Sequence, residues 1–190
     1  MLNSYSRLRI QGRSMLRPYR PCRFAMEFQK KAIKTSVVAC VVDTRERVLL
    51  TRRCIEPFCS LWVMPGGKID HGESIMEALH REVREEVGIE VMVEGLVDVF
   101  EHIGVGDRDD HFVILYYRAS PVTYDLKPNG DECTEAIWAF KSCLPQMALP
   151  PGGRHILSKI FPELPWKERP ADVDLDEEIP GGELRTDESP

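Results

Sequence analysis

The alternation of hydrophobic and polar residues predicts a series of short strands interrupted by two helices. The segments typical of strands share β-branched or alternating apolar positions, and they are residues 35–42, 47–52, 62–64, 89–102, 111–119 and 135–140. The helical pattern occupies residues 74–87 and 152–160, and Pro151 is well placed to begin the second helix. This order predicts an α/β fold with a mixed sheet and helices packed on both of its sides.

Glycines punctuate the chain around the first predicted helix. Pro65-Gly66-Gly67 and Gly72 precede the helix and predict a flexible loop, because a residue without Cβ lets the backbone approach a ligand closely. Gly88 follows the last helical turn and is typical of a helix stop. We therefore expect a mobile, ligand-accessible segment directly before a well-bounded helix.

Three acidic residues fall on one face of that helix. Glu82, Glu85 and Glu86 stand at positions i, i+3 and i+4, which brings their carboxylates close together. Like charges at such short range repel each other unless a cation lies between them, and hard oxygen ligands favour Mg²⁺ or Mn²⁺. The alternative is an ordinary solvated acidic face with no bound ion. The residues around the glutamates decide between these two interpretations.

Residues 67–89 fit the spacing G-x5-E-x7-R-E-U-x-E-E-x-G-U, where U is a bulky aliphatic residue. The fixed positions are Gly67, Glu73, Arg81, Glu82, Glu85, Glu86 and Gly88, with Val83 and Ile89 at the aliphatic ones. At average residue frequencies, a chance match has a probability of roughly 10⁻¹⁰ per starting position. The segment resembles the Nudix box, the signature of hydrolases that cleave a nucleoside diphosphate linked to another group, X.

The resemblance implies a fold and a set of catalytic roles. The fold would be the Nudix α/β/α sandwich over about residues 33–161. Glu85 and Glu86 would be the principal Mg²⁺ ligands, and Glu82 would be a further ligand or the base that activates water. Gly67 would add its backbone carbonyl to the metal shell. Mn²⁺ could replace Mg²⁺, and the choice among the glutamates for the general base stays open.

Supporting residues are also implied by the resemblance. Arg81 would pair with Glu73 and fix the helix against the preceding loop, a structural rather than catalytic role. Many family members use an additional acid from a later loop, for which Glu132 and Glu135 are the candidates here. Both could equally be solvated loop acids.

Several residues outside the motif are candidates for substrate binding. Arg52 and Arg53 end the second strand and could grip a phosphate with their guanidinium groups, or simply form a surface pair. The aromatic residues Phe100, Tyr116, Tyr117 and Trp138 could offer a stacking face for a base, although alternate strand positions are more often core. Because neighbouring strand residues point to opposite faces, only one of the two tyrosines can face the site. Weaker candidates flank the loop at 103–110, namely His102, His111, Glu101 and Asp107 to Asp110.

Composition fits one enzyme domain with two polar extensions. The chain has 190 residues, 43% of them hydrophobic, and no apolar run long enough to cross a membrane. Residues 1–30 form a basic extension, residues 31–163 the predicted Nudix domain, and residues 164–190 an acidic tail that we expect to be disordered. Six cysteines without metal-ligand spacing are typical of reduced thiols. The net charge of −6 disfavours a nucleic-acid partner.

Two interpretations of the basic extension lead to different compartments. Its first 26 residues contain six arginines and no acidic residue, which is typical of a mitochondrial or plastid transit peptide. Alternatively, Met26 is the true start and the protein is cytoplasmic. A small nucleotide is the expected partner in either case, and a homodimer stays open.

The substrate is the least determined part of the prediction. Residues 61–74 and 135–140 resemble the small Nudix group described as ADP-ribose pyrophosphatases, although Val105 stands where one ADP-ribose subgroup has proline. We therefore expect Mg²⁺-dependent cleavage of a nucleoside diphosphate derivative, with ADP-ribose or a nucleotide sugar first. Hydrolysis of oxidised or canonical nucleoside triphosphates is the second hypothesis. A nucleotide-sensing domain without turnover is the third.

Overall fold

The structure is a computed structural model that describes residues 32–104 and 110–166. The elements in these ranges are β1 (Lys34–Val41), β2 (Arg47–Arg53), β3 (Trp62–Val63), β4 (Gly66–Lys68), α1 (Ile75–Val87), β5 (Val91–Ile103), β6 (His111–Pro121), β7 (Cys133–Phe140), the 3-10 helix η1 (Lys141–Gln146) and α2 (Pro151–Ile160). Every element predicted from the hydrophobic pattern is present, with ends that differ by two residues at most. None of the described helices is long and apolar enough to cross a membrane.

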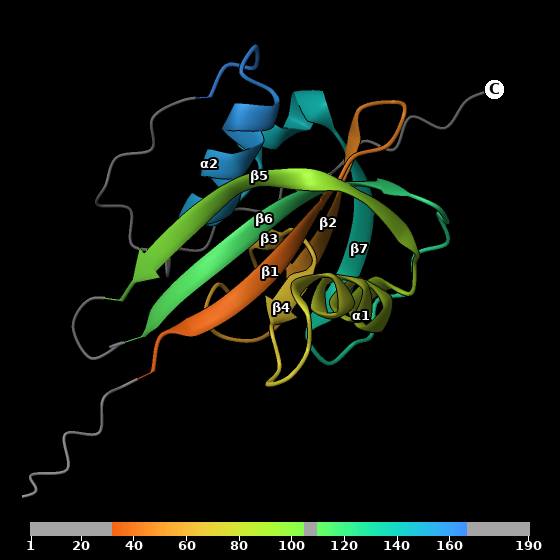
Figure 1. The fold of residues 1–190 in the computed structure, drawn as a ribbon. Helices are drawn as coiled ribbons and strands as arrows, with labels where there is room; N and C mark the ends of the chain where they lie inside the picture. The colour runs from red at the N-terminus through yellow and green to blue at the C-terminus, as the bar shows by residue number, and fades with distance from the viewer. Residues whose placement is uncertain (1–31, 105–109, 167–190) are drawn as a thin grey trace, which may run out of the picture. The chain divides into compact units, whose positions relative to one another are not determined.

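The strands form two sheets rather than one (Figure 1). The larger sheet has the order β4-β1-β6-β5, in which β1 and β6 are parallel and the other pairs antiparallel. The predicted mixed sheet is therefore confirmed. Strands β3, β2 and β7 form a second, antiparallel sheet that the sequence pattern did not separate from the first.

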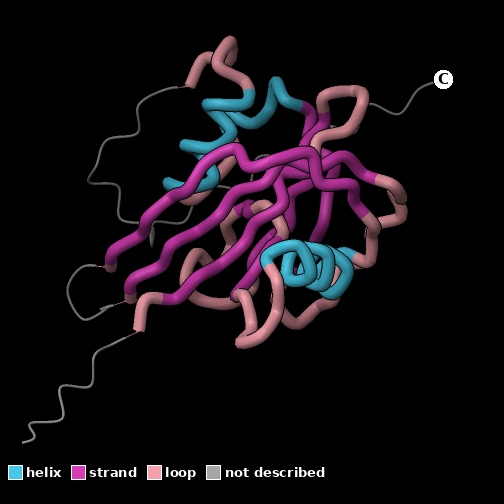
Figure 2. The backbone as a smooth tube through the Cα atoms, in the orientation of Figure 1, coloured by secondary structure: helices cyan, strands magenta, loops and turns pink. Residues whose placement is uncertain are grey.

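Helices cover both faces of the sheets (Figure 2), as the sandwich prediction requires. Along β1, Val37, Ala39 and Val41 belong to the hydrophobic cluster on the α1 side. Cys40 belongs to the cluster on the α2 side, and Val38 packs against that second cluster. A strand buried on both faces needs apolar residues at consecutive positions, which explains the continuous β-branched run in this part of the sequence.

The two helices differ in how they begin. The side chain of Ser74 and that of Glu77 form a reciprocal capping box at the start of α1, and Gly88 ends the helix in the left-handed region at φ 72°. Pro151 occupies the first turn of α2, and no side chain caps that helix. The N–H groups at the start of α2 are therefore left without a capping acceptor.

The flexible loop predicted before α1 is partly wrong. Gly66–Lys68 is strand β4, which pairs antiparallel with β1. Gly66 has φ 152°, and a Cβ built there would lie 2.3 Å from the carbonyl oxygen of Val37. Glycine is required at this position because the backbones of β4 and β1 approach too closely for a side chain, not because the segment must move.

The described residues continue beyond the predicted domain end at residue 163. Leu164 and Trp166, assigned above to the acidic tail, pack against the α2-side cluster, and Trp166 donates a hydrogen bond to the carbonyl of Phe161 at 2.8 Å. The remainder of the predicted tail and the basic extension at residues 1–30 lie outside the described residues.

Candidate functional site

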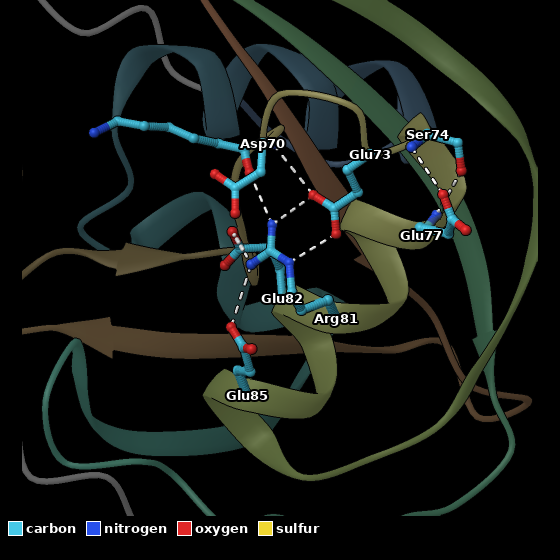
Figure 3. A network of polar contacts seen from close by, with 8 residues as sticks. Asp70, Glu73, Ser74, Glu77, Arg81, Glu82 and Glu85 are labelled. Carbon is cyan, nitrogen blue, oxygen red and sulfur yellow. Dashed lines mark hydrogen bonds and ion pairs between the residues drawn. The ribbon is translucent and has the colours of Figure 1, made fainter.

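Arg81 is the centre of a polar network that joins α1 to the segment before it (Figure 3). Its guanidinium donates to both carboxylate oxygens of Glu73 at 2.8 and 2.9 Å. It also donates to Glu82 at 2.9 Å, to Glu85 at 3.2 Å and to the backbone carbonyl of Lys68 at 3.0 Å. The hydrogen bonds with Glu73 raise the pKa of Arg81 and lower that of Glu73. The contact between Arg81 and Glu73 implied by the resemblance is present, and the bond from Arg81 to the Lys68 carbonyl ties α1 to β4.

The network separates the three helix glutamates into two environments. Glu85 is exposed and bonds to Arg81. Glu82 and Glu86 are buried, and their carboxylates gather with that of Glu132, with one oxygen of each lying within 4.8 Å of the others. Of the two later acids predicted from the sequence, Glu132 therefore joins the cluster.

Burial and mutual repulsion disfavour the charged form of this cluster. Burial raises the pKa of Glu82. Burial, followed by the charges of Glu82 and Glu132, raises the pKa of Glu86 to about 8. The backbone N–H of Gly66 donates to the Glu86 carboxylate, while the Oε2 atom of Glu86 has no hydrogen-bond partner among the described residues. A buried carboxylate oxygen left without a donor is costly, so the cluster calls for a positive partner.

These three carboxylates fit a hard divalent cation. They supply only oxygen ligands and excess negative charge, which is the donor set that Mg²⁺ and Mn²⁺ prefer. Gly67 lies directly beside the cluster, because a Cβ built on it would come within 2.4 Å of the Glu82 carboxylate. A side chain at this position would displace the Glu82 carboxylate, so glycine leaves the backbone of residue 67 adjacent to the carboxylates.

A cavity of about 510 Å³ opens beside Glu82, Glu132 and Gly67. Its lining comes from the β1, β5 and β6 face, from the segment at 53–58, and from the start of α2. Aromatic rings are prominent along it and come from Phe58, Phe100, His102, Phe112 and Tyr116. The cavity therefore offers a charged end for phosphates and an aromatic, largely apolar region for a ring.

The two predicted arginines lie in different places. Arg53 lines the cavity, donates to the carbonyl of Pro57 at 2.7 Å and lowers the pKa of Glu86 by its charge. Arg52 pairs instead with Glu135 at 3.0 Å, and both side chains are exposed and outside the cavity lining. Of the two predicted arginines and the two predicted later acids, the geometry therefore favours Arg53 and Glu132 over Arg52 and Glu135.

Two of the four predicted aromatic candidates line the cavity and two do not. Phe100 and Tyr116 line the cavity, whereas Tyr117 packs on the α1 side of the sheet, as the alternation along β6 predicts. Trp138 contacts Tyr124, with ring centroids 5.4 Å apart, and does not line the cavity.

The loop candidates are less closely connected to the site. His102 lines the cavity, but Glu101 pairs with His111 at 2.7 Å, and neither of these two lines it. Asp110 lines the cavity and forms an ion pair with Lys34. Asp107 to Asp109 lie outside the described residues.

Some lining residues carried no recognisable signal in the sequence. Phe58 belongs to an irregular segment without hydrophobic periodicity, and Gly152 and Gly153 form the first turn of α2. The dipeptide of glycines inside a predicted helix was the one available hint, because glycine disfavours helix interiors unless another element approaches closely.

Comparisons with known proteins agree with this architecture. Residues 33–164 match the profile of the family described as NUDIX domain. An ADP-ribose pyrophosphatase of Methanocaldococcus jannaschii is 30% identical over 110 residues, which cover 57% of this chain and 63% of that protein. A human 8-oxo-dGDP phosphatase is 30% identical over 116 residues, covering 61% of this chain but 35% of that protein. The chain thus spans less than two thirds of the length of both relatives.

A solved structure supports the same fold. The MutT NUDIX hydrolase from Burkholderia pseudomallei superimposes with a TM-score of 0.62 and 28% sequence identity, over 68% of this chain and 99% of that one. The predicted α/β sandwich, with a mixed sheet between helices, is therefore confirmed.

Proposed function

Because this chain belongs to the Nudix family, we propose that it is a Mg²⁺-dependent hydrolase of the pyrophosphate bond in nucleoside diphosphates linked to a group X. The observation that carries the proposal is the cluster of Glu82, Glu86 and Glu132 beside the cavity, with one buried Glu86 oxygen lacking a donor among the described residues. A solvated acidic face would not bury two carboxylates beside a third.

We assign the metal to Glu82, Glu86 and Glu132, with the Gly67 carbonyl and Glu85 as further ligands. A bound Mg²⁺ would neutralise pyrophosphate oxygens and lower the pKa of a water molecule. Mn²⁺ satisfies the same donor set. Glu85 would have to leave Arg81 to take part, since its carboxylate bonds to Arg81 in this structure.

Side chains around the metal site would accept a proton from water, bind a phosphate of the substrate and hold α1 in position. Glu82 lines the cavity beside the other two carboxylates, where it could also accept a proton from water. Arg53 lies at the charged end of the cavity, where its guanidinium could hold a phosphate oxygen. Arg81 and Glu73 keep α1 fixed against β4, so that the glutamates and Gly67 stay in position.

For the substrate, we propose ADP-ribose or a nucleotide sugar first. The archaeal relative is named an ADP-ribose pyrophosphatase, and the aromatic region of the cavity can accommodate a base. Oxidised or canonical nucleotides come second, because the human relative is named an 8-oxo-dGDP phosphatase. A nucleotide sensor without turnover is disfavoured, since all three box glutamates are retained.

A product assay on the full chain tests this proposal. Purified protein with Mg²⁺ would be incubated with ADP-ribose, GDP- and UDP-sugars, and canonical and oxidised nucleotides, and products would be resolved by chromatography. We expect a nucleoside monophosphate from one substrate class and no product after chelation of the metal. Binding of a nucleotide without any cleavage across the panel would reject the hydrolase and favour the sensor.

A further inference from the structure

The start of α2 places two unused backbone donors at the wall of the cavity. Pro150, Pro151, Gly152 and Gly153 all line it, and the two glycines are buried. Proline has no N–H, so the donors of this first turn belong to Gly152 and Gly153. Neither of their N–H groups has a hydrogen-bond acceptor within the described part of the chain, and no side chain caps the helix. The N–H of Arg154 is the first to bond, to the Pro150 carbonyl at 2.9 Å.

A side-chain donor lies at the same place. Tyr116 is 95% buried, its ring lines the cavity, and its hydroxyl would lie 2.9 Å from a Cβ built on Gly152. This hydroxyl has no hydrogen-bond partner in residues 32–104 and 110–166, and it is not enclosed by protein atoms, so a ligand in the cavity can reach it. Burial raises the pKa of Tyr116, which keeps the proton on the oxygen at neutral pH. The two backbone donors and the hydroxyl thus lie on one wall of the cavity, where a ligand that supplies an acceptor can satisfy them.

The walls around these donors are apolar. Val38 is the direct neighbour of Tyr116 on β1, and Asp98 is its neighbour on β5. Asp98 is paired with His155 and Lys159 and does not line the cavity, whereas Phe100 and Ile114 do. Lys34 lies four residues before Val38 on β1, about 13 Å away in an extended strand, and it is paired with Asp110. The donors therefore have flat apolar neighbours and no adjacent cationic side chain among the residues that line this part of the cavity.

We propose that the start of α2 and Tyr116 form a base-recognition subsite for a nucleobase that carries an exocyclic carbonyl oxygen. The N–H groups of Gly152 and Gly153 and the Tyr116 hydroxyl donate to that oxygen, while the base lies against Phe100. The oxygen meant is that at position 6 of guanine and hypoxanthine or at position 4 of uracil, where adenine and cytosine present an amino group. The O2 oxygen, which cytosine shares with uracil, lies beside the sugar. This subsite rests on the proposed function and changes the order of its substrates, because it favours guanine or uracil derivatives, including GDP- and UDP-sugars, over ADP-ribose.

The chemistry of the pocket disfavours the two other occupants of a helix N-terminus. A phosphate would have to lose its water among Phe100, Ile114 and Val38 with no cation among the side chains that line this part of the cavity, which is costly for a charged group. An exocyclic amino group would place donor against donor, and a site built of unpaired donors rejects such a group strongly. A neutral carbonyl oxygen satisfies the donors without either penalty.

Calorimetric titration of the full chain tests the subsite with two matched pairs of nucleotides. Inosine and adenosine monophosphate differ at position 6 and the adjoining N1 proton, and uridine and cytidine monophosphate differ at position 4 and the adjoining N3 proton. We expect the carbonyl-bearing member of at least one pair to bind about tenfold tighter, as one well-formed hydrogen bond allows. Equal affinity in both pairs, preference for the amino bases, or no measurable binding would overturn the subsite.

Matched variants separate this subsite from a general effect on the sheet. Tyr116→Phe removes a hydroxyl without a described partner, so the fold should survive, and the affinity for the preferred nucleotide should fall about fivefold. Tyr117→Phe, on the opposite face of β6, should leave the affinity unchanged. Gly152→Ala should also weaken binding, because its Cβ would lie 2.9 Å from the Tyr116 hydroxyl and 3.0 Å from Phe100. An unchanged base preference in both Tyr116→Phe and Gly152→Ala would reject the assignment.

The binding readout keeps the two proposals distinguishable. If the carbonyl bases are preferred but no substrate is cleaved with Mg²⁺, the hydrolase proposal fails and the subsite stands. If cleavage occurs with no base preference and Tyr116→Phe behaves like the parent protein, the subsite fails and the hydrolase stands.

Discussion

The two helices that border the cavity differ in whether a side chain caps their N-termini. α1 begins with a closed capping box, in which Glu77 accepts from the Ser74 N–H at 2.9 Å and the Ser74 hydroxyl accepts from the Glu77 N–H at 3.3 Å. α2 begins with Pro151 and two buried glycines, without a side-chain cap. A capped helix end has its hydrogen bonds satisfied locally, while an open end keeps donors for another molecule.

The polar groups near the two helices also differ in charge. Arg81 pairs with Glu82 and Glu85, whereas the Oε2 atom of Glu86 in the carboxylate cluster has no hydrogen-bond partner among the described residues. At the start of α2 the unused groups are neutral donors among apolar walls. We infer from this comparison that polar groups without a hydrogen-bond partner mark the binding regions of this protein. A cation is expected at the carboxylate cluster beside α1, and a neutral acceptor at the start of α2.

The sharpest test at the α1 end is Glu86→Gln. Losing this buried carboxylate should lower turnover by at least about a hundredfold, in line with the loss of a key electrostatic group. Stability without metal should be unchanged or higher, because the substitution removes one of three mutually repelling carboxylates. Steady-state kinetics and thermal unfolding would measure the two effects.

Glu85→Gln is the matched control for that variant. Glu85 is exposed and lies outside the cluster, so its loss should be smaller than that of Glu86→Gln. Normal turnover in Glu86→Gln would contradict the metal assignment, and equal losses in both variants would show that Glu85 moves into the metal shell.

Arg81→Lys probes the network that fixes α1 against β4. A lysine cannot reproduce the fork that reaches Glu73, Glu82 and the Lys68 carbonyl together, so activity should fall by about tenfold through misplacement of the glutamates. Arg84→Lys, which alters only an exposed pair with Glu90, should retain the parent activity. Mg²⁺ affinity would be followed with the kinetics, and equal values for the two variants would remove Arg81 from any positioning role.

Two glycine variants compare the packing beside α1, where Gly67 of β4 lies, with the packing at the start of α2, where Gly153 lies. Gly67→Ala should lower the free energy of unfolding by about 2 kcal/mol, because its Cβ would approach the Glu82 carboxylate to 2.4 Å. At the start of α2, a Cβ on Gly153 would meet its nearest atoms at 3.5 Å or more, so Gly153→Ala should be neutral or slightly stabilising. Urea denaturation would measure both, and a tolerated Gly67→Ala would show that β4 and α1 can separate.

The smallest expected effect is at the cap of α1. Ser74→Ala removes one half of the capping box and should cost about 1 kcal/mol of unfolding free energy, with catalysis preserved at temperatures where the protein is folded. Ser74→Thr keeps a hydroxyl acceptor and should cost less. A loss of turnover in the folded Ser74→Ala protein would mean that the cap also positions the glutamates.

The elements that could be predicted share strong local signals. The α1 segment carries an apolar stripe, a capping box and a terminal glycine, so its ends follow from local chemistry alone. The strand β1 is recognisable because a continuous β-branched run fits only an element buried on both faces. By contrast, β4 was expected to be a flexible loop, because its glycines are explained only by the nearby backbone of β1.

The residues of the site likewise include some that the sequence could predict and others that it could not. The spacing of Glu82, Glu85 and Glu86 predicts a shared helix face, but one face of a helix contains both a buried and an exposed edge. Glu85 therefore lies with Arg81, and Glu132, which the sequence could not separate from Glu135, joins the cluster. The choice depends on which strand ends meet, and no local pattern records that contact.

The sequence by itself determined the family, the order of the strands and helices, and the motif residues that would carry metal chemistry, because these depend on residue type and short-range spacing. Only the tertiary structure decided that two sheets share the core, which acids converge, and that the open end of α2 meets Tyr116 at the cavity. These features join residues far apart in the chain, and long-range packing, not local preference, brings their side chains within contact distance.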